Sequence, residues 1–272
     1  MFQRTVLTIA AIAASLSCAT AAPGDRAKFL EGASAAKLSP EELAEEVKGY
    51  LPPGSIDVAE VLQPPPAIDS PADKADVALF RQTTARVSAE RWARALADDA
   101  SVYDRFERQL GFAPDRKHVP RFVRLLNRVS EDVLAAASEA KKQFPRPRPF
   151  QRFALTRICG EKTPPKPEAS PTKGTAYPSG HAALSWAAAL VMVEAYPQSA
   201  QAIVLRAVDY GESRIVCGVH FPSDVQAGQL LATAVVDKLF ALPEFHRDFV
   251  CAKRELQAVA IGERSEDQPA CQ

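Results

Sequence analysis

The sequence has no net charge, and beyond its first residues it has no long apolar run. Its 33 lysines and arginines balance 33 aspartates and glutamates, so no field of the whole protein would attract nucleic acid or an acidic membrane surface. No later segment has the roughly 18 uninterrupted apolar residues that a membrane-spanning helix needs. We therefore expect a soluble mature protein without a nucleic-acid partner or a membrane span, in which a local cluster of cations would have to bind any anion.

Alternating apolar and polar residues, which are typical of half-buried strands, are also scarce. Apolar residues instead recur at spacings of three and four, and two Ser-Pro pairs give helix start signals. The pattern predicts an all-α bundle with helices over about 39–51, 70–86, 88–99, 101–110, 119–143, 180–195, 199–211 and 223–241. The helix over about 223–241 is expected to be the last large one. The proline-rich stretch 52–66 is expected to cross the surface in extended form.

Length and composition suit a single domain over residues 22–272. It would have a proline-rich N-terminal arm over about 22–70 and a core over about 71–257. The stretch Glu161 to Tyr177, which is rich in proline and lysine, is expected to be its most conspicuous internal loop.

The first 21 residues have the pattern of a signal peptide. Arg4 precedes an apolar run from Val6 to Leu16, and the small residues Ala19-Thr20-Ala21 end the segment. We expect cleavage after Ala21 and a periplasmic or secreted protein. Two alternatives remain: a buried N-terminal helix, and a lipoprotein cleaved before Cys18, against which Ser15 argues because a large aliphatic residue is usual there.

Cleavage would leave four cysteines, at 159, 217, 251 and 271. An even number in an oxidising compartment indicates disulfides, and three pairings are open. We favour Cys159–Cys217, which would join two of the motif regions described next, and Cys251–Cys271, which would enclose a short C-terminal segment.

Three short stretches each combine a cation or a histidine with a residue that shapes the backbone: Lys141 to Pro149, Pro178 to His181 and Ser213 to Asp224. Together they contain three cations, two histidines and one carboxylate. This inventory suits a phosphoryl group, because Arg148 and Arg214 can chelate its oxygens while Lys141 adds a point charge.

The second stretch predicts an anion site at a helix start. Ser179 is a good N-cap, and a long apolar helix begins at Gly180 or His181. Its free N–H groups would face an anion, which Gly180 would allow to approach closely. The alternative is an ordinary capped helix with a surface histidine.

The third stretch places Asp224 four residues after His220. If Pro222 opens the next helix, the carboxylate can reach imidazole Nδ1, fix the tautomer and leave Nε2 bare for attack. The alternative is a structural His–Asp pair. His118 and His246 have no comparable neighbours in the sequence, and we expect both to be surface residues.

The three stretches spell K-x6-R-P, P-S-G-H and S-R-x5-H-x3-D in this order. In this the chain resembles the acid phosphatase and vanadium haloperoxidase superfamily, also called type-2 phosphatidic acid phosphatases, and within it the bacterial class A non-specific acid phosphatases. Arg146-Pro147 also spells R-P, but Glu139 stands seven residues before Arg146, whereas Lys141 stands seven before Arg148. Pro145 and Pro147 must end the preceding helix before Arg148.

The resemblance implies an all-α phosphatase domain of this type and a role for each motif residue. Phosphate would be held by Lys141, Arg148, Ser179, Gly180 and Arg214. His220 would be the nucleophile and Asp224 would orient it, while His181 would donate a proton to the leaving alcohol and then act as base for water. No metal or cofactor is expected.

The resulting hypothesis is a secreted acid phosphatase that hydrolyses small phosphomonoesters through a phosphohistidine and is inhibited by phosphate or vanadate. Alternatives are a soluble phosphatase for lipid-like phosphates, a vanadate-dependent haloperoxidase, whose relatives are much longer, and a phosphate binder without turnover. The physiological substrate, phosphotransfer as a side activity and assembly into a homo-oligomer stay open. Substrate breadth is expected to depend on the Glu161 to Tyr177 loop.

Overall fold

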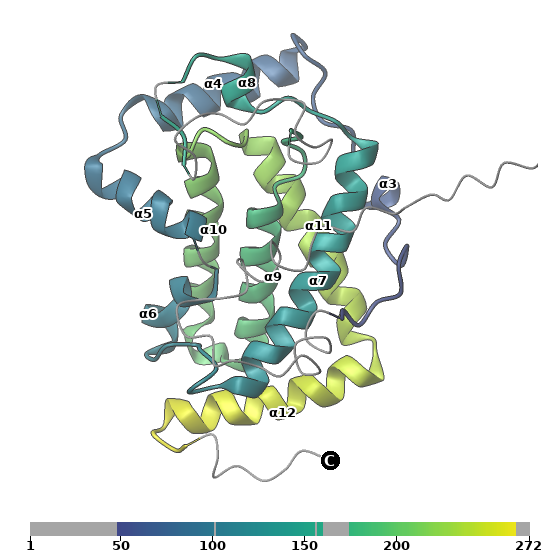
Figure 1. The fold of residues 1–272 in the computed structure, drawn as a ribbon, viewed down its shortest axis with the longest axis vertical. Helices are drawn as coiled ribbons and strands as arrows, with labels where there is room; N and C mark the ends of the chain where they lie inside the picture. Colours follow the sequence, from purple (N-terminus) through teal and green to yellow (C-terminus); the bar gives the residue numbers. More distant parts are fainter. Residues whose placement is uncertain (1–47, 101, 156, 160–173, 265–272) are drawn as a thin grey trace, which may run out of the picture.

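The computed structural model describes residues 48–100, 102–155, 157–159 and 174–264 (Figure 1). Within these ranges every regular element is a helix, and the β-type pairing is limited to an isolated bridge between Pro147 and Thr175. The all-α fold class expected from the sequence is therefore confirmed.

The long helices are arranged as a bundle with a cover at each end (Figure 1). The helices that run lengthwise are α7 (Pro120–Gln143), α9 (Gly180–Ala195), α10 (Ala200–Val216) and α11 (Pro222–Phe240). Helix α12 (Pro243–Ala260) lies across one end, and α4 (Pro71–Ala85) and the short α8 (Pro149–Arg152) lie across the other. Helix α5 (Ala89–Ala100) packs beside α10.

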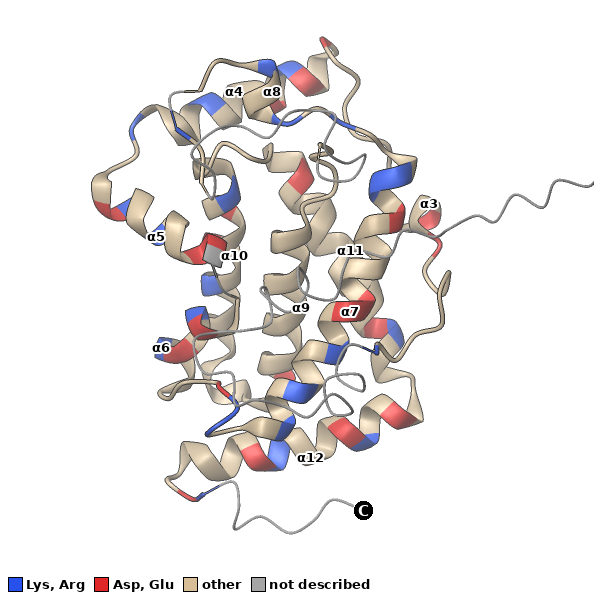
Figure 2. Cartoon of the chain, in the orientation of Figure 1, with Lys and Arg blue, Asp and Glu red and all other residues tan. Residues whose placement is uncertain are grey.

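Helix α9 is the central element, in contact with α7, α10 and α11. It is apolar on nearly every face, and Glu194 is its one charged residue. Figure 2 shows the charges gathered instead on outer helices such as α5 and α12. A helix that is apolar all round is stable only when buried, so this composition explains why α9 lies inside the bundle.

Close packing of α9 against α11 depends on Gly228. A Cβ atom at this position would lie 2.4 Å from the Ser179 carbonyl oxygen. Any larger residue would therefore push the start of α9 away from α11.

Most helix boundaries agree with the sequence prediction to within two residues. Residues 103–110 form a 3₁₀ turn, η1 (Tyr103–Phe106), followed by α6 (Glu107–Leu110), and Gly111 ends this segment with a left-handed φ of 84°. Helix α10 continues five residues beyond the predicted end at 211.

Three predictions of secondary structure were wrong. Residues 48–51 are not helical, and the rest of the helix expected over 39–51 lies outside the described residues. The stretch 52–66 contains α3 (Val58–Val61), and Val58 and Leu62 are buried in the main core, so it does not simply cross the surface. Helix α12 was missed, although Pro243 starts it and its apolar side chains recur at helical spacing.

A disulfide joins Cys159 to Cys217, which caps the C-terminal end of α10. Cys251 is also disulfide-bonded, but Cys271 lies outside the described residues, and the pairing of these two stays a prediction. Residues 1–47, which include the expected signal peptide, are outside them too. In the part of the chain that is described, no single helix could span a membrane; α11 and α12 meet the length and composition criteria only as a pair bent by 96°.

Candidate active site

The three motif stretches meet at the end of the bundle covered by α4 and α8 (Figure 1). This is where α7 and α10 end and where α9 and α11 begin. Hydrogen bonds connect the stretches: Ser179 N–H donates to the Asp224 carbonyl, and Arg148 Nη1 donates to the Val219 carbonyl. All eight predicted site residues therefore lie in one region, although 83 positions separate Lys141 from Asp224.

The start of α9 has the geometry of an anion site. Ser179 is the N-cap, and its side chain accepts a hydrogen bond of 3.3 Å from the N–H of Ala182. A Cβ added to Gly180 would meet no atom within 4 Å, so the backbone is open on that side. The N–H groups of the first helical turn and the positive end of the helix dipole are thus available to an anion.

Lys141 lies in the last turn of α7 and binds the segment that leads into α9. Its Nζ donates to the carbonyl oxygens of Thr175 at 2.9 Å and Pro178 at 2.6 Å. An ammonium group has three protons, so one remains for a ligand. Burial, reinforced by the nearby charge of Arg148, lowers the pKa of Lys141 to about 7.

Arg214 is the most deeply buried of the three cations, with 1% of its surface exposed. Its Nη2 donates to Asp99 Oδ1 at 2.6 Å. Its Nε and Nη1 are buried and meet no acceptor among the described residues. Buried donors without an acceptor are costly, so the Nε and Nη1 protons of Arg214 are available to the oxygens of a bound phosphate.

His220 lies between a cation and a carboxylate. Its Nε2 is 3.2 Å from Arg148 Nη1, and its Nδ1 is 3.6 Å from Asp224 Oδ2. The second distance is within the range of an ion pair but is too long for a hydrogen bond. The expected contact of Asp224 with His220 Nδ1 is therefore present as a close approach of the two groups and not as a hydrogen bond.

Both histidines are held in the neutral form. Burial, followed by the charges of Arg148, Lys141 and Arg214, lowers the pKa of His220 well below its usual value. Burial also lowers the pKa of His181, with Arg214 and His220 adding to the effect. A neutral imidazole has a lone pair with which to attack, and its charged form is stabilised only when negative charge arrives.

Sequence reasoning missed one arginine of this region. Arg146, set aside because it falls outside the K-x6-R-P register, is buried and bonds to Asp224, Asp76 and Ser223. The signal available in the sequence was the pair of arginines two residues apart, only one of which the motif explains. Asp99 and Asp76 were missed as well, because they come from helices far away in the sequence.

The prediction for the two remaining histidines was partly wrong. His246 is exposed, as expected. His118 is partly exposed but has an acidic neighbour, since its Nδ1 lies 2.7 Å from Asp115 Oδ1. His246 lies in the first turn of α12 and His118 just before the start of α7, so both are at the end of the bundle opposite the motif region (Figure 1).

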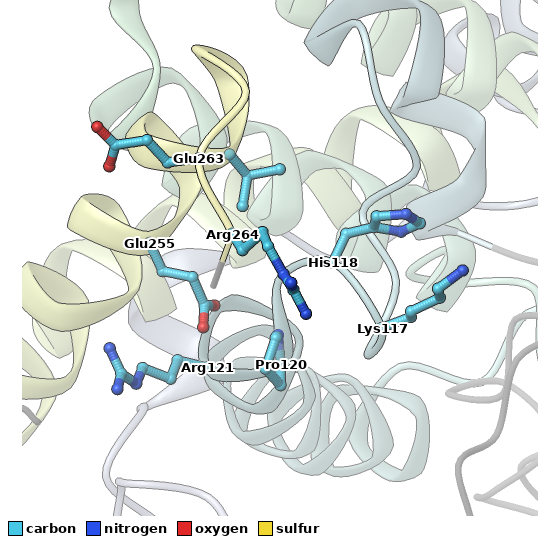
Figure 3. Close-up of a pocket in the computed structure, with 8 residues that line it drawn as sticks. Lys117, His118, Pro120, Arg121, Glu255, Glu263 and Arg264 are labelled. Atoms are coloured by element: carbon cyan, nitrogen blue, oxygen red, sulfur yellow. The ribbon is translucent and has the colours of Figure 1, made fainter. Parts of the chain in front are cut away.

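A cavity of about 640 Å³ lies at the opposite end of the bundle, where α7 starts and α12 ends (Figure 3). Lys117, His118, Arg121 and Arg264 line it together with Glu255. Glu255 Oε2 accepts the N–H of Phe122 and so serves the start of α7. None of the predicted site residues lines this cavity. Among the described residues, no group of three or more histidine, cysteine or acidic side chains could hold a metal ion.

Comparison with known proteins identifies a family for the part of the chain that carries the three motif stretches. The family model of the PAP2 superfamily matches residues 129–246, which include every predicted site residue. A non-specific acid phosphatase of Providencia stuartii is 33% identical over 207 residues, which cover 74% of this chain and 81% of that protein. An acid phosphatase of Zymomonas mobilis is 33% identical over 77% of the chain and 79% of its own length. A non-specific acid phosphatase of Salmonella typhimurium is 32% identical over 76% and 83%.

Proposed function

The chain belongs to the PAP2 superfamily and is an acid phosphatase, and from this premise we propose that it hydrolyses small phosphomonoesters through a phosphohistidine on His220, without a metal ion. The single observation that most supports the proposal is the buried guanidinium of Arg214, whose Nε and Nη1 lack a protein acceptor among the described residues beside two neutral histidines.

Three cations would replace a metal electrostatically. Arg148 and Arg214 would each bind phosphoryl oxygens, Lys141 would use its third proton, and the start of α9 at Ser179 and Gly180 would add N–H donors. Preorganised donors in a buried site stabilise the extra negative charge of a five-coordinate phosphorus without reorganisation. The same feature would make vanadate, which adopts that geometry, a competitive inhibitor.

In the first step, the lone pair of His220 Nε2 would form a bond to phosphorus as the bond from phosphorus to the ester oxygen breaks. The departing oxygen would take a proton from His181. In the second step, water would attack the phosphohistidine, His181 would accept a proton from that water, and His220 would be released. Asp224 would stabilise the positive charge that develops on the His220 ring.

His181 must be protonated to act as the acid, although burial and Arg214 hold its pKa low. A bound phosphoryl group brings negative charge into the site and would raise the pKa of His181. Proton donation would thus be coupled to the presence of substrate, which favours turnover at acidic pH.

We further propose that the protein is exported to the periplasm or secreted after cleavage at Ala21. The Cys159–Cys217 disulfide supports this, because disulfides persist mainly in oxidising compartments.

The proposal is tested by assaying p-nitrophenyl phosphate hydrolysis at acidic pH with chelator present. Wild-type protein and His246→Ala, whose side chain is exposed on α12, should be equally active, and vanadate should inhibit both competitively. His220→Ala should lose activity by several orders of magnitude, as expected for a covalent nucleophile. Loss of wild-type turnover on chelation, restored by zinc or magnesium, would contradict the metal-free mechanism.

A further inference from the structure

Arg146 occupies a buried position between α7 and α8 and bonds to two other elements. Its side chain is 3% exposed. Nη1 donates to Asp224 Oδ1 at 2.6 Å and to Ser223 Oγ at 2.7 Å, both on α11. Nη2 donates to Asp76 Oδ2 on α4 at 2.8 Å. One guanidinium therefore connects the start of α11 to the helix that covers this end of the bundle.

Asp76 binds the same turn directly. Its Oδ1 accepts the N–H of Ser223 at 3.0 Å, and its Oδ2 accepts Ser223 Oγ at 2.5 Å. The Arg146 guanidinium also lies 4.4 Å from the centre of the Phe221 ring. The residues on either side of Pro222 are thus fixed by the pair formed by Arg146 and Asp76.

These contacts determine how the Asp224 carboxylate is turned. Oδ1 is bound by Arg146, and Oδ2 accepts the N–H of Phe221 at 2.7 Å while it lies 3.6 Å from His220 Nδ1. Rotation of the carboxylate would break the bond to Arg146. The oxygen that faces the imidazole is therefore selected by the arginine behind it.

We propose that Arg146 is a positioning residue for the phosphatase reaction. It orients the Asp224 carboxylate and keeps it ionised beside His220, and Asp76 anchors Arg146 for this purpose. The inference rests on the proposed function of His220. Arg146 lies on the far side of Asp224 from His220 and is not one of the residues proposed to bind phosphate.

Charge balance around Asp224 supports this role. Burial raises the pKa of Asp224, while the charges of Arg146 and then Lys141 lower it. Tyr177 and His220 are the other titratable groups that face this carboxylate. On the far side of Arg146, the charged groups are Asp73 and Asp76 of α4 and Arg152 of α8, which pairs with Asp73. Without Arg146, Lys141 would be the remaining cation among the described residues that lowers the pKa of Asp224, and the carboxylate would take up a proton at a higher pH.

The geometry also distinguishes arginine from lysine at this position. A guanidinium presents donors in a planar fork that reaches Asp224 and Asp76 at once, whereas an ammonium is a point charge on a flexible stem. Lysine would preserve the charge that keeps Asp224 ionised but would lose the double contact that orients it.

The test compares Arg146→Gln, Arg146→Lys and Arg152→Lys by pH–rate profiles with p-nitrophenyl phosphate. Arg152 belongs to the same cluster but bonds to Asp73 rather than to Asp224, so Arg152→Lys should match wild type. Arg146→Gln should lower kcat by about 10- to 100-fold, the usual consequence of a misplaced catalytic group, with KM nearly unchanged. It should also shift the acid limb of the profile to higher pH. Arg146→Lys should lower kcat while the acid limb stays in place.

A double-mutant cycle separates positioning from general stabilisation. In an Asp224→Asn background, Arg146→Gln should have little further effect on kcat, because the carboxylate it acts through is gone. Equal losses in both backgrounds, or an Arg146→Gln variant with the wild-type profile, would overturn the inference. If thermal melting shows that Arg146→Gln is unfolded, Arg146→Lys decides alone, and wild-type kcat in that variant would overturn it. Wild-type protein without turnover would instead refute the proposed function itself.

Discussion

The carboxylate of Asp99 binds one nitrogen of the buried Arg214 guanidinium, with 2.6 Å between Oδ1 and Nη2. This contact holds a cation in the interior and leaves Nε and Nη1 unused by Asp99. Because Nε and Nη1 meet no acceptor among the described residues, Arg214 is fixed in position through Nη2 and has two donors available to a ligand.

Replacement of Arg214 should therefore reduce phosphate recognition more than stability. Arg214→Lys keeps the charge but loses the Nε and Nη1 donors, and kcat/KM should fall by about 10² to 10³, as on removal of a donor to a transition-state oxyanion. The inhibition constant for vanadate should rise in parallel. Arg94→Lys is the matched control, since Arg94 pairs with Asp209 and is 46% exposed. Equal inhibition by vanadate in Arg214→Lys and wild type would contradict the assignment.

The pH profile should be bell-shaped with an acidic optimum. Because burial and the cations lower the pKa of His220, the nucleophile stays neutral and competent at pH values where a free imidazole would be protonated. Activity falls on the acid side when His220 or Asp224 takes up a proton, and on the alkaline side when His181 loses one.

Lys141 should contribute a separate loss of affinity on the alkaline side. With its pKa lowered to about 7, the side chain loses its charge as pH rises through that value, so KM and the inhibition constant for phosphate should increase. Lys141→Met should bind phosphate weakly at all pH values, whereas Lys142→Met, at the exposed neighbouring position, should retain the wild-type dependence. For His220 and His181, the same measurements give the test: a rate profile that stays flat from acid to alkaline pH would refute the roles proposed for these two histidines.

Reduction of the Cys159–Cys217 disulfide should lower thermal stability. The bond closes a loop of 58 residues, which in the loop-entropy description is worth about 4 kcal/mol. Unfolding of the double Cys159→Ser and Cys217→Ser variant should show a lower midpoint than wild type, and wild type in reductant, where the bond of Cys251 is reduced as well, should not exceed the midpoint of the variant. A variant midpoint equal to that of untreated wild type, once peptide mapping has verified the bond in untreated protein, would contradict this. The same mapping tests the pairing of Cys251 with Cys271.

The sequence predicts much of the site because its motifs lie where helices begin and end. Ser179 before Gly180, and Pro222 between His220 and Asp224, specify helix starts through local chemistry that a linear pattern preserves. The long helices are likewise recognisable from their spacing of apolar residues.

The contacts that a linear pattern cannot show are those made across the fold. Asp99 and Asp76 reach the site from α5 and α4, and nothing near them in the sequence marks them. Arg146 precedes Arg148 by two residues, but only the bend after α7 decides that Arg146 turns toward Asp224 while Arg148 turns toward His220. Helix α12 was missed for a different reason: charged residues stand between Phe245, Phe249 and Leu256 and made their apolar spacing hard to recognise.

His181 should matter in proportion to the basicity of the leaving group. His181→Ala should slow alkyl phosphates by about 10² to 10⁴, as loss of general acid catalysis does. It should slow formation of the phosphoenzyme from p-nitrophenyl phosphate much less, because nitrophenolate departs as a stable anion. If His181→Ala slowed phosphoenzyme formation equally for alkyl and aryl phosphates, and His220→Ala retained aryl turnover, the roles of the two histidines would be reversed.

Direct detection of the intermediate tests the central claim. His181 is also the base for the second step, so His181→Ala should accumulate phosphoenzyme with p-nitrophenyl phosphate. Rapid quenching without acid treatment, followed by peptide mass spectrometry, should place an acid-labile phosphate on His220 and on no other residue, and His220→Ala should show none. Phosphate found on another side chain would contradict the account. So would wild-type turnover in a single displacement that inverts the configuration at phosphorus, with no phosphoenzyme trapped.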